Sequence, residues 1–335
     1  MTEDQTTALA PYVRILGRGP GRSRNLTREE AGEAMRLMLA GRVAPESVGA
    51  LLMLMRFRGE NPEEIAGFCD GARDSLPEWR ALAPSIDWPS YAAGRSRGLP
   101  YFLLAARLCA MAGQTVMLHG WNSAAHMRAA ADLRGMLAPI GIPVVETPEA
   151  AGEALASGGI CYAPLEAMSP DLYRLLRLRD LFGLRSAVNT TLRVMCPSGA
   201  ATSVQGVFHP PYRPLQASAS MLLGQPRQVA LKGGGGEFER NPAKSVTLEG
   251  VTGGARYETE AAPLIDETRR LAEAEPVPAH LPALWEGTRT DPFAEAIVTG
   301  TAAAALFAAG LFPDLGVAEA EAGRLWATRP RSQAA

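Results

Sequence analysis

Residues 115–120 read TVMLHG and residues 228–242 read QVALKGGGGEFERNP, and in both a short strand-forming run ends in glycine. A third short run is IPVVET at 142–147, and beyond Pro84 such runs alternate with alanine-rich stretches of helical character. This alternation is typical of βα units around a mostly parallel sheet. The sequence therefore predicts an α/β fold for this part of the chain.

The segment 26–75 has a different pattern, which predicts three short helices. Thr27 followed by Glu30 makes a capping box, and Asn61 followed by proline opens the third helix. Pro45 suits the first position of the middle helix, whose apolar residues follow at helical spacing: Val48, Leu51, Leu52 and Met55. A small helical bundle is expected to precede the sheet.

Two later segments also read as helical. Residues 168–190, MSPDLYRLLRLRDLFGLRSAVNT, predict a helix pair that returns to the bundle. Residues 291–311 predict one alanine-rich helix packed on the sheet, with Asp291 as its cap and Pro292 in its first turn.

Composition limits the classes of protein that fit. The chain has 335 residues, 47% of them apolar, and a formal net charge of −2. It is long enough for one large or two medium globular domains. The overall charge argues mildly against nucleic acid, so a polyanion site requires a local basic cluster.

The four cysteines are widely spaced and predict buried free thiols rather than a zinc site or a disulfide framework. The N-terminus is polar, and no apolar run approaches the length of a membrane span. We therefore expect a cytoplasmic protein that is neither exported nor inserted into a membrane.

Ligands of such sheets bind beyond the carboxyl ends of the strands. Three turns qualify: 90–101 (SYAAGRSRGLPY), His119–Gly120 and Gly233–Gly236. In the first turn, Arg95 and Arg97 either clamp a phosphate at a helix N-terminus or are solvated loop residues. The glycine run is either an anion-binding nest or a flexible loop.

Several stretches resemble anthranilate phosphoribosyltransferase and the family-three glycosyltransferases, over essentially the whole chain: LTREEA, GALLMLMRFRGENPEEIAGF, HG, RDLFGLRSAVN and KGGGGE. RILGRGPG at 14–21 and DWPSYAAGRSR at 87–97 are more similar to a divergent paralogue group, often labelled glycosyltransferase-like, some of whose members bind nucleic acid.

The resemblance implies two domains of the nucleoside phosphorylase and phosphoribosyltransferase type. A helical domain of residues 11–85 with 168–192 would form a homodimer. An α/β domain of residues 86–167 with 193–335 would bind phosphate. A cleft between the two domains would take phosphoribosyl pyrophosphate, with magnesium as a possible cofactor.

The resemblance also shows which chemical groups have changed. The enzyme's glycine-rich diphosphate loop falls on residues 91–95, where only Gly94 remains and no acid is present. In its lysine-histidine-glycine-asparagine-arginine motif, the lysine is replaced by Leu118 and the asparagine by Trp121. Its Asp-Glu metal pair falls on Phe238 and Glu239. Losing groups that stabilise transition-state charge implies loss of ordinary anthranilate transfer.

Other matching residues are retained. Arg179 matches the arginine that clamps the carboxylate of anthranilate, and Arg185 and Asn189 match the stretch after it. Arg174, Arg177 and Arg179 either line the cleft or form a solvated helix face. With four arginines of the N-terminal stretch they would form a basic groove across a dimer: Arg14, Arg18, Arg22 and Arg24.

Four residues are open to two interpretations each. His119 either donates a hydrogen bond to a ligand or is a structural turn residue. Trp121 either stacks on a base or plugs the old substrate site. Glu237 and Glu239 are the predicted magnesium ligands, with a solvated loop as the alternative.

We therefore predict that the chain binds a phosphate-rich ligand, with nucleic acid as the preferred class, and lacks anthranilate transfer. The alternative is an active magnesium-dependent phosphoribosyl or glycosyl transferase with another acceptor, and a structural or regulatory protein is a third possibility. The predicted phosphate-binding residues are Tyr91, Gly94, Arg95, Arg97, His119, Gly120, Asn122, Ser123, Lys232 and Gly233. The predicted acceptor or polyanion residues are Trp121, Arg174, Arg177, Arg179, Arg185 and Asn189.

Overall fold

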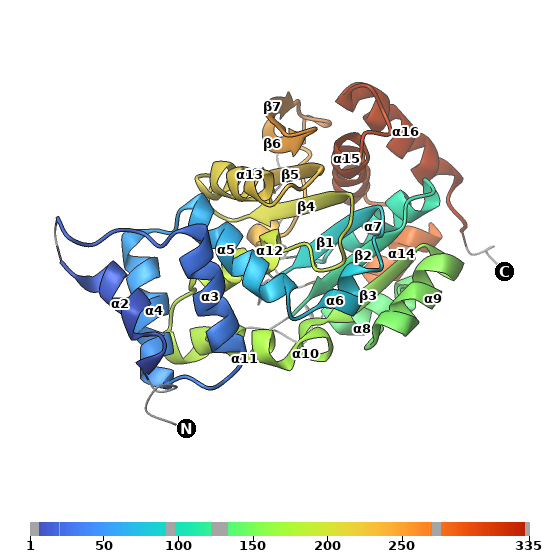
Figure 1. Cartoon of the computed structure of the whole chain (residues 1–335). Helices are drawn as coiled ribbons and strands as arrows, with labels where there is room; N and C mark the ends of the chain where they lie inside the picture. The colour runs from blue at the N-terminus through green and yellow to red at the C-terminus, as the bar shows by residue number, and fades with distance from the viewer. Residues whose placement is uncertain are drawn as a thin grey trace.

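The computed structural model describes residues 7–19, 21–91, 98–121, 133–267, 269 and 276–331. Its centre is a seven-stranded sheet in the order β3-β2-β1-β4-β5-β6-β7 (Figure 1). Strands β1 to β5 are parallel, and β6 and β7 continue the sheet in antiparallel pairs, which confirms the predicted mostly parallel sheet. The strands are β1 (Ile86–Ser90), β2 (Val116–Gly120), β3 (Ile160–Pro164), β4 (Thr202–Val207), β5 (Arg227–Lys232), β6 (Val246–Thr252) and β7 (Ala255–Ala261).

The run IPVVET at 142–147 is not a strand, contrary to prediction. Only Val144 forms a bridge, beside Tyr162 of β3. Pro143 has no backbone N–H to donate, although its carbonyl accepts the N–H of Tyr162 at 2.9 Å. Proline therefore confines this segment to a brief contact at the edge of the sheet.

The N-terminal helices form the predicted bundle. The three helices expected between residues 26 and 75 are confirmed, and both capping boxes are present: the side chain of Thr27 accepts the N–H of Glu30 at 3.2 Å, and that of Asn61 accepts the N–H of Glu64 at 2.8 Å. The helices of this region are α2 (Ala10–Gly17), α3 (Arg28–Leu39), α4 (Pro45–Arg58), α5 (Pro62–Arg73) and α6 (Pro77–Arg80).

Helices α3 and α5 approach each other at glycine. A Cβ atom on Gly67 would lie 2.1 Å from the carbonyl oxygen of Arg28, and one on Gly71 would lie 2.6 Å from that of Gly32. Both distances are far shorter than a van der Waals contact. The absence of side chains at these positions lets the two backbones pack directly.

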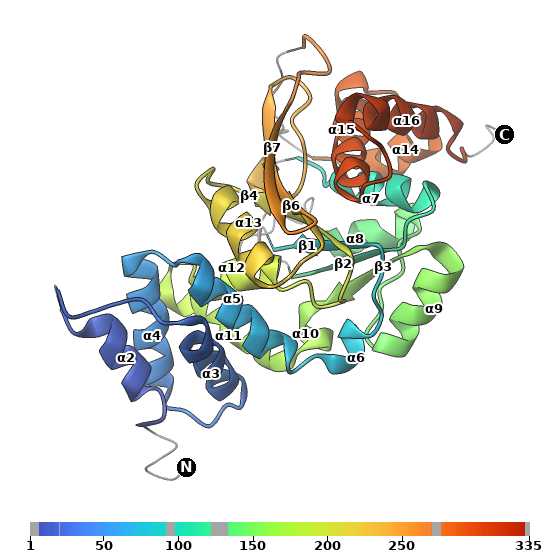
Figure 2. The ribbon, with the colours of Figure 1, turned by 45° about the horizontal axis from the view of Figure 1, so that its top comes forward.

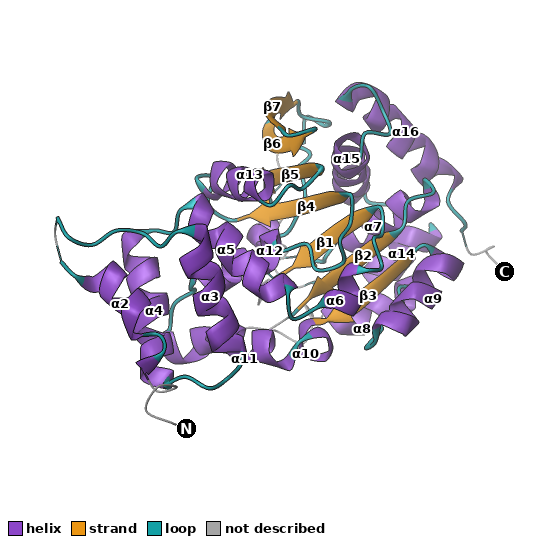
Figure 3. Cartoon of the chain, in the orientation of Figure 1, coloured by secondary structure: helices purple, strands orange, loops and turns teal. Residues whose placement is uncertain are grey.

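The predicted helix pair at 168–190 is present as α11 (Pro170–Phe182) and α12 (Ala187–Val194). Leu172, Leu175 and Leu176 of α11 are buried in the hydrophobic cluster of the bundle. Figure 3 shows α11 beside the helices of the bundle and α12 between the bundle and the sheet. Helix α12 therefore joins the bundle to strands β1 and β4. The exact division of the chain into two domains stays a prediction.

Alternate residues of the strands face two separate hydrophobic clusters, because side chains alternate along a strand. Trp88 and Leu118 point to one cluster, and Met117 points to the cluster that includes the bundle. In Figure 2 the sheet lies between the bundle and helices α15 and α16. The remaining helices are α7 (Phe102–Met111), α8 (Leu133–Leu137), α9 (Pro148–Gly158), α10 (Leu165–Met168), α13 (Tyr212–Leu222), α14 (His280–Glu286), α15 (Pro292–Ala308) and α16 (Leu315–Thr328).

The alanine-rich C-terminal helix is α15, and its predicted cap is confirmed, because the side chain of Asp291 accepts the N–H of Ala294 at 3.2 Å. All four cysteines are free and buried, as expected. Within the described ranges, no helix combines the length and apolar character that a membrane crossing requires.

Candidate functional site

The ends of β1 and β2 meet at the predicted ligand edge of the sheet. Ser90 and Gly120 are paired in register, and a Cβ atom on Gly120 would lie 2.1 Å from the carbonyl oxygen of Ser90. The same carbonyl accepts the N–H of Trp121 at 3.2 Å. Glycine at position 120 thus lets the chain turn at this edge and fixes the start of the following segment.

His119 lies beneath this edge in a buried hydrogen-bonded chain. The hydroxyl of Tyr91 is 2.8 Å from His119 Nδ1, and His119 Nε2 is 3.3 Å from a carboxylate oxygen of Asp87. The other oxygen of Asp87 accepts the hydroxyl of Ser198 at 3.0 Å. Tyr91 is 1% exposed and His119 is fully buried. This geometry supports the structural interpretation of His119, and its direct contact with a ligand stays a prediction.

Trp121 packs against helix α11. It is 6% exposed, and its ring meets that of Tyr173 edge-on, with the centroids 5.7 Å apart. The guanidinium carbon of Arg179 also lies 5.7 Å from the centre of the Trp121 ring. So little free ring surface leaves no room for stacking on a base. The structure therefore favours the plug interpretation of Trp121.

The charged side chain of Arg179 is largely withdrawn from water, which is electrostatically unfavourable. Its side chain is 8% exposed, and its Nε lies 3.7 Å from a carboxylate oxygen of Asp180. Its Nη1 is buried without a hydrogen-bond partner among the described residues. Burial lowers the pKa of Arg179, and the positive charge of Arg185 lowers it further. An anion that reached this guanidinium would satisfy it.

Arg193 was not predicted, and it lies at the centre of the edge. Its Nη1 donates to the carbonyl of Asn189 at 3.2 Å and its Nη2 to that of Tyr91 at 3.1 Å. Burial, followed by the charge of Arg185, lowers the pKa of Arg193 to about 10. The sequence signal that could have pointed to Arg193 is its position four residues after Asn189, which places both residues on the same face of α12.

Arg185 connects these groups to the bundle. Burial lowers its pKa, the carboxylate of Glu237 opposes that change, and the positive charge of Arg56 adds to it. Arg56, on α4, donates to the hydroxyl of Tyr212 at 2.9 Å. We call Arg56, Arg179, Arg185 and Arg193 the arginine cluster, because the charge of one member lowers the pKa of the next: Arg56 acts on Arg185, Arg185 acts on Arg179, and both Arg185 and Arg179 act on Arg193.

The glycine-rich turn folds back against β4. A Cβ atom on Gly233 would lie 1.6 Å from the carbonyl oxygen of Glu237, and one on Gly206 would lie 2.1 Å from the carbonyl carbon of Glu237. The turn therefore has a fixed path that only glycine permits. Lys232, which ends β5 just before this turn, is exposed.

The predicted metal ligands point to different places. The hydroxyl of Ser90 donates to the carboxylate of Glu237 at 3.2 Å, and the N–H of Phe102 donates to that of Glu239 at 3.0 Å. The two carboxylates thus contact the chain before and after residues 92–97. Phe238 is fully buried against Trp88. Within the described ranges, no three histidine, cysteine or acidic side chains gather where they could hold a metal ion.

Asn189 and two of the predicted arginines have structural partners. The side-chain oxygen of Asn189 accepts the N–H of Ser186 at 3.2 Å in a capping box. Arg174 donates to the carbonyl of Met38 at 2.9 Å, and Arg177 lies 3.7 Å from a carboxylate oxygen of Asp180. The side chains of Arg174 and Arg177 are about half exposed.

Some predicted residues cannot be placed at this edge. Gly94, Arg95, Arg97, Asn122 and Ser123 lie outside the described residues. Helix α2 lies at the outer end of the bundle, away from the sheet (Figure 1). Arg24 pairs with Glu30 at 2.6 Å. The groove that Arg14, Arg18, Arg22 and Arg24 would form with the other arginines across a dimer stays a prediction.

Comparison with known proteins gives consistent matches. Residues 10–76 match the helical bundle domain of a glycosyl transferase family. Anthranilate phosphoribosyltransferase from Methylobacterium sp. (strain 4-46) is 30% identical over 323 residues, which cover 94% of this chain and 93% of that protein.

Solved structures agree over nearly the whole chain. The crystal structure of anthranilate phosphoribosyltransferase from Thermus thermophilus matches with a TM-score of 0.77 at 25% identity, covering 96% of this chain and 95% of that one. The enzyme from Saccharomyces cerevisiae in complex with phosphoribosyl pyrophosphate and magnesium matches with a TM-score of 0.74 at 12% identity, covering 97% and 95%. The second likeness supports the fold alone.

Proposed function

Since the chain belongs to the anthranilate phosphoribosyltransferase family, we propose that it binds a phosphate-rich ligand where the carboxyl edge of its sheet meets the bundle, and that it no longer carries out ordinary anthranilate transfer. The observation that carries this proposal is the arginine cluster beside a plugged acceptor position. The preferred ligand class is nucleic acid.

The arginine cluster favours an anionic ligand. Like charges that are withdrawn from water repel one another strongly, and Glu237 is the carboxylate whose charge opposes this effect on Arg185 and Arg193. A bound phosphate adds negative charge beside the cluster and accepts forked hydrogen bonds from a guanidinium group. Both Nη atoms of Arg193 already donate to backbone carbonyls, so Arg193 acts on the local potential, whereas Arg185 is only partly buried.

The position of Trp121 argues against anthranilate transfer. By the family resemblance, Arg179 would clamp the carboxylate of the acceptor, but here its guanidinium faces an indole ring. Leu118, at the position of the family's lysine, is fully buried and cannot meet a diphosphate. Removing one group that stabilises transition-state charge typically costs about 3 kcal/mol. Two such changes leave little of the ordinary rate.

Magnesium fits this edge only together with a ligand. Mg²⁺ is usually bound through one or two carboxylates plus substrate phosphates. Glu237 is the acid nearest to such a role, because it contacts Ser90 at the end of β1. Glu239 is fully buried and accepts a backbone N–H of α7. When bound, the ion would offset phosphate charge, while Arg185 would orient the phosphate.

A second candidate function is magnesium-dependent phosphoribosyl transfer to an acceptor other than anthranilate. It is favoured by the match to anthranilate phosphoribosyltransferases over nearly the whole chain. In this case Arg179 would orient the acceptor and Glu237 would share the metal ion with the diphosphate.

We also propose that the protein is a homodimer. Three large apolar side chains are exposed where α4 ends and α11 turns into α12: Phe57 is 90% exposed, Leu181 82% and Leu184 53%. Phe57 follows Arg56 and Leu184 precedes Arg185, and these two arginines lie near each other. Exposed apolar residues that gather in one place are typical of an interface.

The two candidate functions are tested by binding and turnover with the full chain. Anisotropy with labelled single-stranded and double-stranded DNA is measured across salt, and calorimetry with phosphoribosyl pyrophosphate is run with and without Mg²⁺. A log-log salt slope of about −2 to −4 is expected if two to four phosphates are contacted. Anthranilate consumption, followed by its fluorescence, is expected to stay at background.

Arg185→Gln is the test variant and Arg42→Gln, which removes an exposed charge from the turn after α3, is its charge-matched control. Weaker DNA binding in the first variant alone supports the nucleic-acid proposal. Salt-insensitive or absent DNA binding, together with tight magnesium-dependent binding of phosphoribosyl pyrophosphate, replaces it with the second candidate. Anthranilate turnover at the rate of a family enzyme overturns both.

A further inference from the structure

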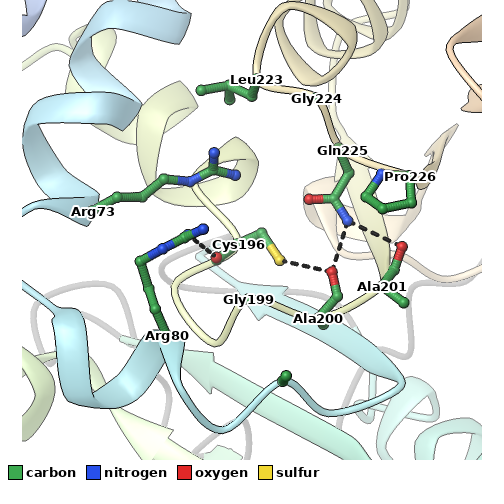
Figure 4. Close-up of a pocket in the computed structure, with 11 residues that line it drawn as sticks. Arg73, Arg80, Cys196, Gly199, Ala200, Ala201, Leu223, Gly224, Gln225 and Pro226 are labelled. Carbon is green, nitrogen blue, oxygen red and sulfur yellow. Dashed lines mark hydrogen bonds between the residues drawn. The ribbon is translucent and has the colours of Figure 1, made fainter.

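A cavity of about 300 Å³ opens at the amino ends of the strands, on the opposite side of the sheet from the candidate site. Its walls come from the segments that lead into β1, β4 and β5, and from α5 and α6 (Figure 4). Strand β1 has five residues, so about 13 Å separates its two ends. The cavity is therefore not part of the arginine cluster.

Two half-buried arginines point into this cavity. Arg73 ends α5 and donates from Nε to the carbonyl of Met195 at 2.6 Å, and Arg80 ends α6 and donates from Nη1 to the carbonyl of Cys196 at 3.4 Å. Figure 4 shows their guanidinium groups side by side. Most of their N–H groups thus remain available on the cavity side.

Neither arginine forms an ion pair with a described residue. The nearby carboxylates are already engaged, because Asp70 lies 2.6 Å from Arg28 and Asp74 lies 2.7 Å from Arg36. Two partly buried cations that lack a carboxylate partner leave an excess of positive charge in a small space. A dianion of matching size would neutralise it.

The opposite wall supplies an acceptor and an apolar surface. The side-chain amide of Gln225 donates to the carbonyls of Ala200 at 2.9 Å and Ala201 at 3.2 Å, which turns its oxygen toward the cavity (Figure 4). Leu223 and Pro226 form the apolar part of the wall. The cavity therefore presents guanidinium groups on one side and a hydrogen-bond acceptor beside apolar surface on the other.

The backbone around the cavity is strained. Ala83 and Cys196 both have φ of +42°, and in the described part of the chain they are the non-glycine residues with positive φ. Both line the cavity. Side chains rarely adopt this conformation, and such strain clusters at functional sites.

We propose that this cavity is a second anion site, which binds a small phosphomonoester. The phosphate lies between Arg73 and Arg80, because two guanidinium groups match the charge and the oxygen geometry of a phosphate dianion. A hydroxyl or amine of the ligand donates to the side-chain oxygen of Gln225, and its carbon skeleton contacts Leu223 and Pro226.

The test uses the full chain and two probes, inorganic phosphate and glycerol 3-phosphate, with affinities measured by calorimetry. Arg80→Gln is the first variant, since its side-chain hydrogen bond to the carbonyl of Cys196 is long at 3.4 Å, and Arg73→Gln is the second. We expect each variant to bind glycerol 3-phosphate at least about tenfold more weakly, since a hydrogen bond to a charged group is lost. Arg42→Gln is the matched control and should bind like the wild type.

Arg185→Gln separates this site from the candidate site, and it should leave this component of binding unchanged. Unchanged affinity in both cavity variants overturns the proposal. Free phosphate that binds as tightly as glycerol 3-phosphate overturns the monoester assignment. If both variants fail to fold, wild-type crystals soaked in tungstate decide the matter: anomalous density between Arg73 and Arg80 supports the site, and its absence there overturns it.

Discussion

The guanidinium carbon of Arg179 lies 5.7 Å from the centre of the Trp121 ring. This contact joins the end of β2 to helix α11, at the position where the family resemblance places an acceptor. A cation over an indole is worth about 0.5 to 2 kcal/mol, more when it is shielded from water. The pair therefore stabilises the packing of the end of β2 against α11, and by our proposal it also blocks acceptor binding.

A double-mutant cycle of Trp121→Leu and Arg179→Gln should give a coupling free energy of about 0.5 to 2 kcal/mol. The measurement is the free energy of unfolding in urea for the wild type, both single variants and the double variant. If the two single effects add to within about 0.3 kcal/mol, the contact makes no energetic contribution.

Arg185→Gln should reduce the salt slope of DNA binding by about 1, since one phosphate contact is lost. The affinity should fall on all DNA sequences alike, because phosphate contacts carry no sequence information. Anisotropy titrations at several salt concentrations measure both quantities. An unchanged slope would place the DNA elsewhere on the protein.

Phe57→Ser should shift the protein from dimer to monomer, because it removes the most exposed large apolar side chain beside the α11–α12 turn. Sedimentation velocity over a range of concentrations measures the distribution. Val317→Ser on α16, where the valine is 44% exposed, is the control and should leave the distribution unchanged. A monomeric wild type would exclude the proposed dimer.

Glu64 should make stability depend on pH. Its carboxylate is 1% exposed, and burial raises its pKa, although the N–H groups of Leu26 and Asn61 donate to it at 2.9 Å and 3.0 Å and oppose this change. A raised pKa means that the folded state holds the proton more firmly than the unfolded state does. The stability from this proton is complete below 4.5, the ordinary pKa of the group, and is lost as pH rises through the folded pKa.

The stability of the wild type relative to Glu64→Gln should therefore decrease as pH rises above 4.5. Urea unfolding at several pH values measures this difference. Glu63→Gln removes an exposed carboxylate from the same helix and serves as the control. A difference that is independent of pH, or that increases with pH, contradicts the prediction.

Gly67→Ala should destabilise the protein by about 3 kcal/mol, because the new methyl group would overlap the backbone of α3. Gly323→Ala on α16 is the matched control, since its Cβ would meet no atom within 4 Å. That substitution should stabilise the protein by about 0.5 to 1 kcal/mol through helix propensity. Thermal and urea unfolding measure both, and equal effects would refute the close approach of α3 and α5.

The parts of the fold that depend on local signals were predictable from the sequence. Thr27, Asn61 and Asp291 cap helices through bonds to residues three positions away, so their patterns are visible in a short window. The prediction of a strand at 142–147 was wrong for a related reason. Its β-branched residues suggest a strand, but Pro143 prevents regular pairing. Helices α2 and α16 and the antiparallel β6–β7 pair were missed, although Gly253–Gly254 between these strands is a turn signal.

The candidate site was less predictable, because it depends on contacts between distant segments. Arg193 matters through its bond to the carbonyl of Tyr91, 102 positions earlier in the chain. The sequence left two interpretations of Trp121, and only its packing against Tyr173 and Arg179 favours one. Arg73 and Arg80 belong to separate helices, and no local pattern shows that they share a cavity.

The buried thiols allow the rate of local unfolding to be measured separately on the two faces of the sheet. Cys109 belongs to the hydrophobic cluster that contains α15, and Cys69 belongs to the cluster of the bundle. A thiol reagent can modify either one only after its own cluster has opened to solvent. Native protein would be labelled briefly and its peptides analysed by mass spectrometry. The labelling of Cys69 and Cys109 would then report the opening of each face without any substitution in the chain.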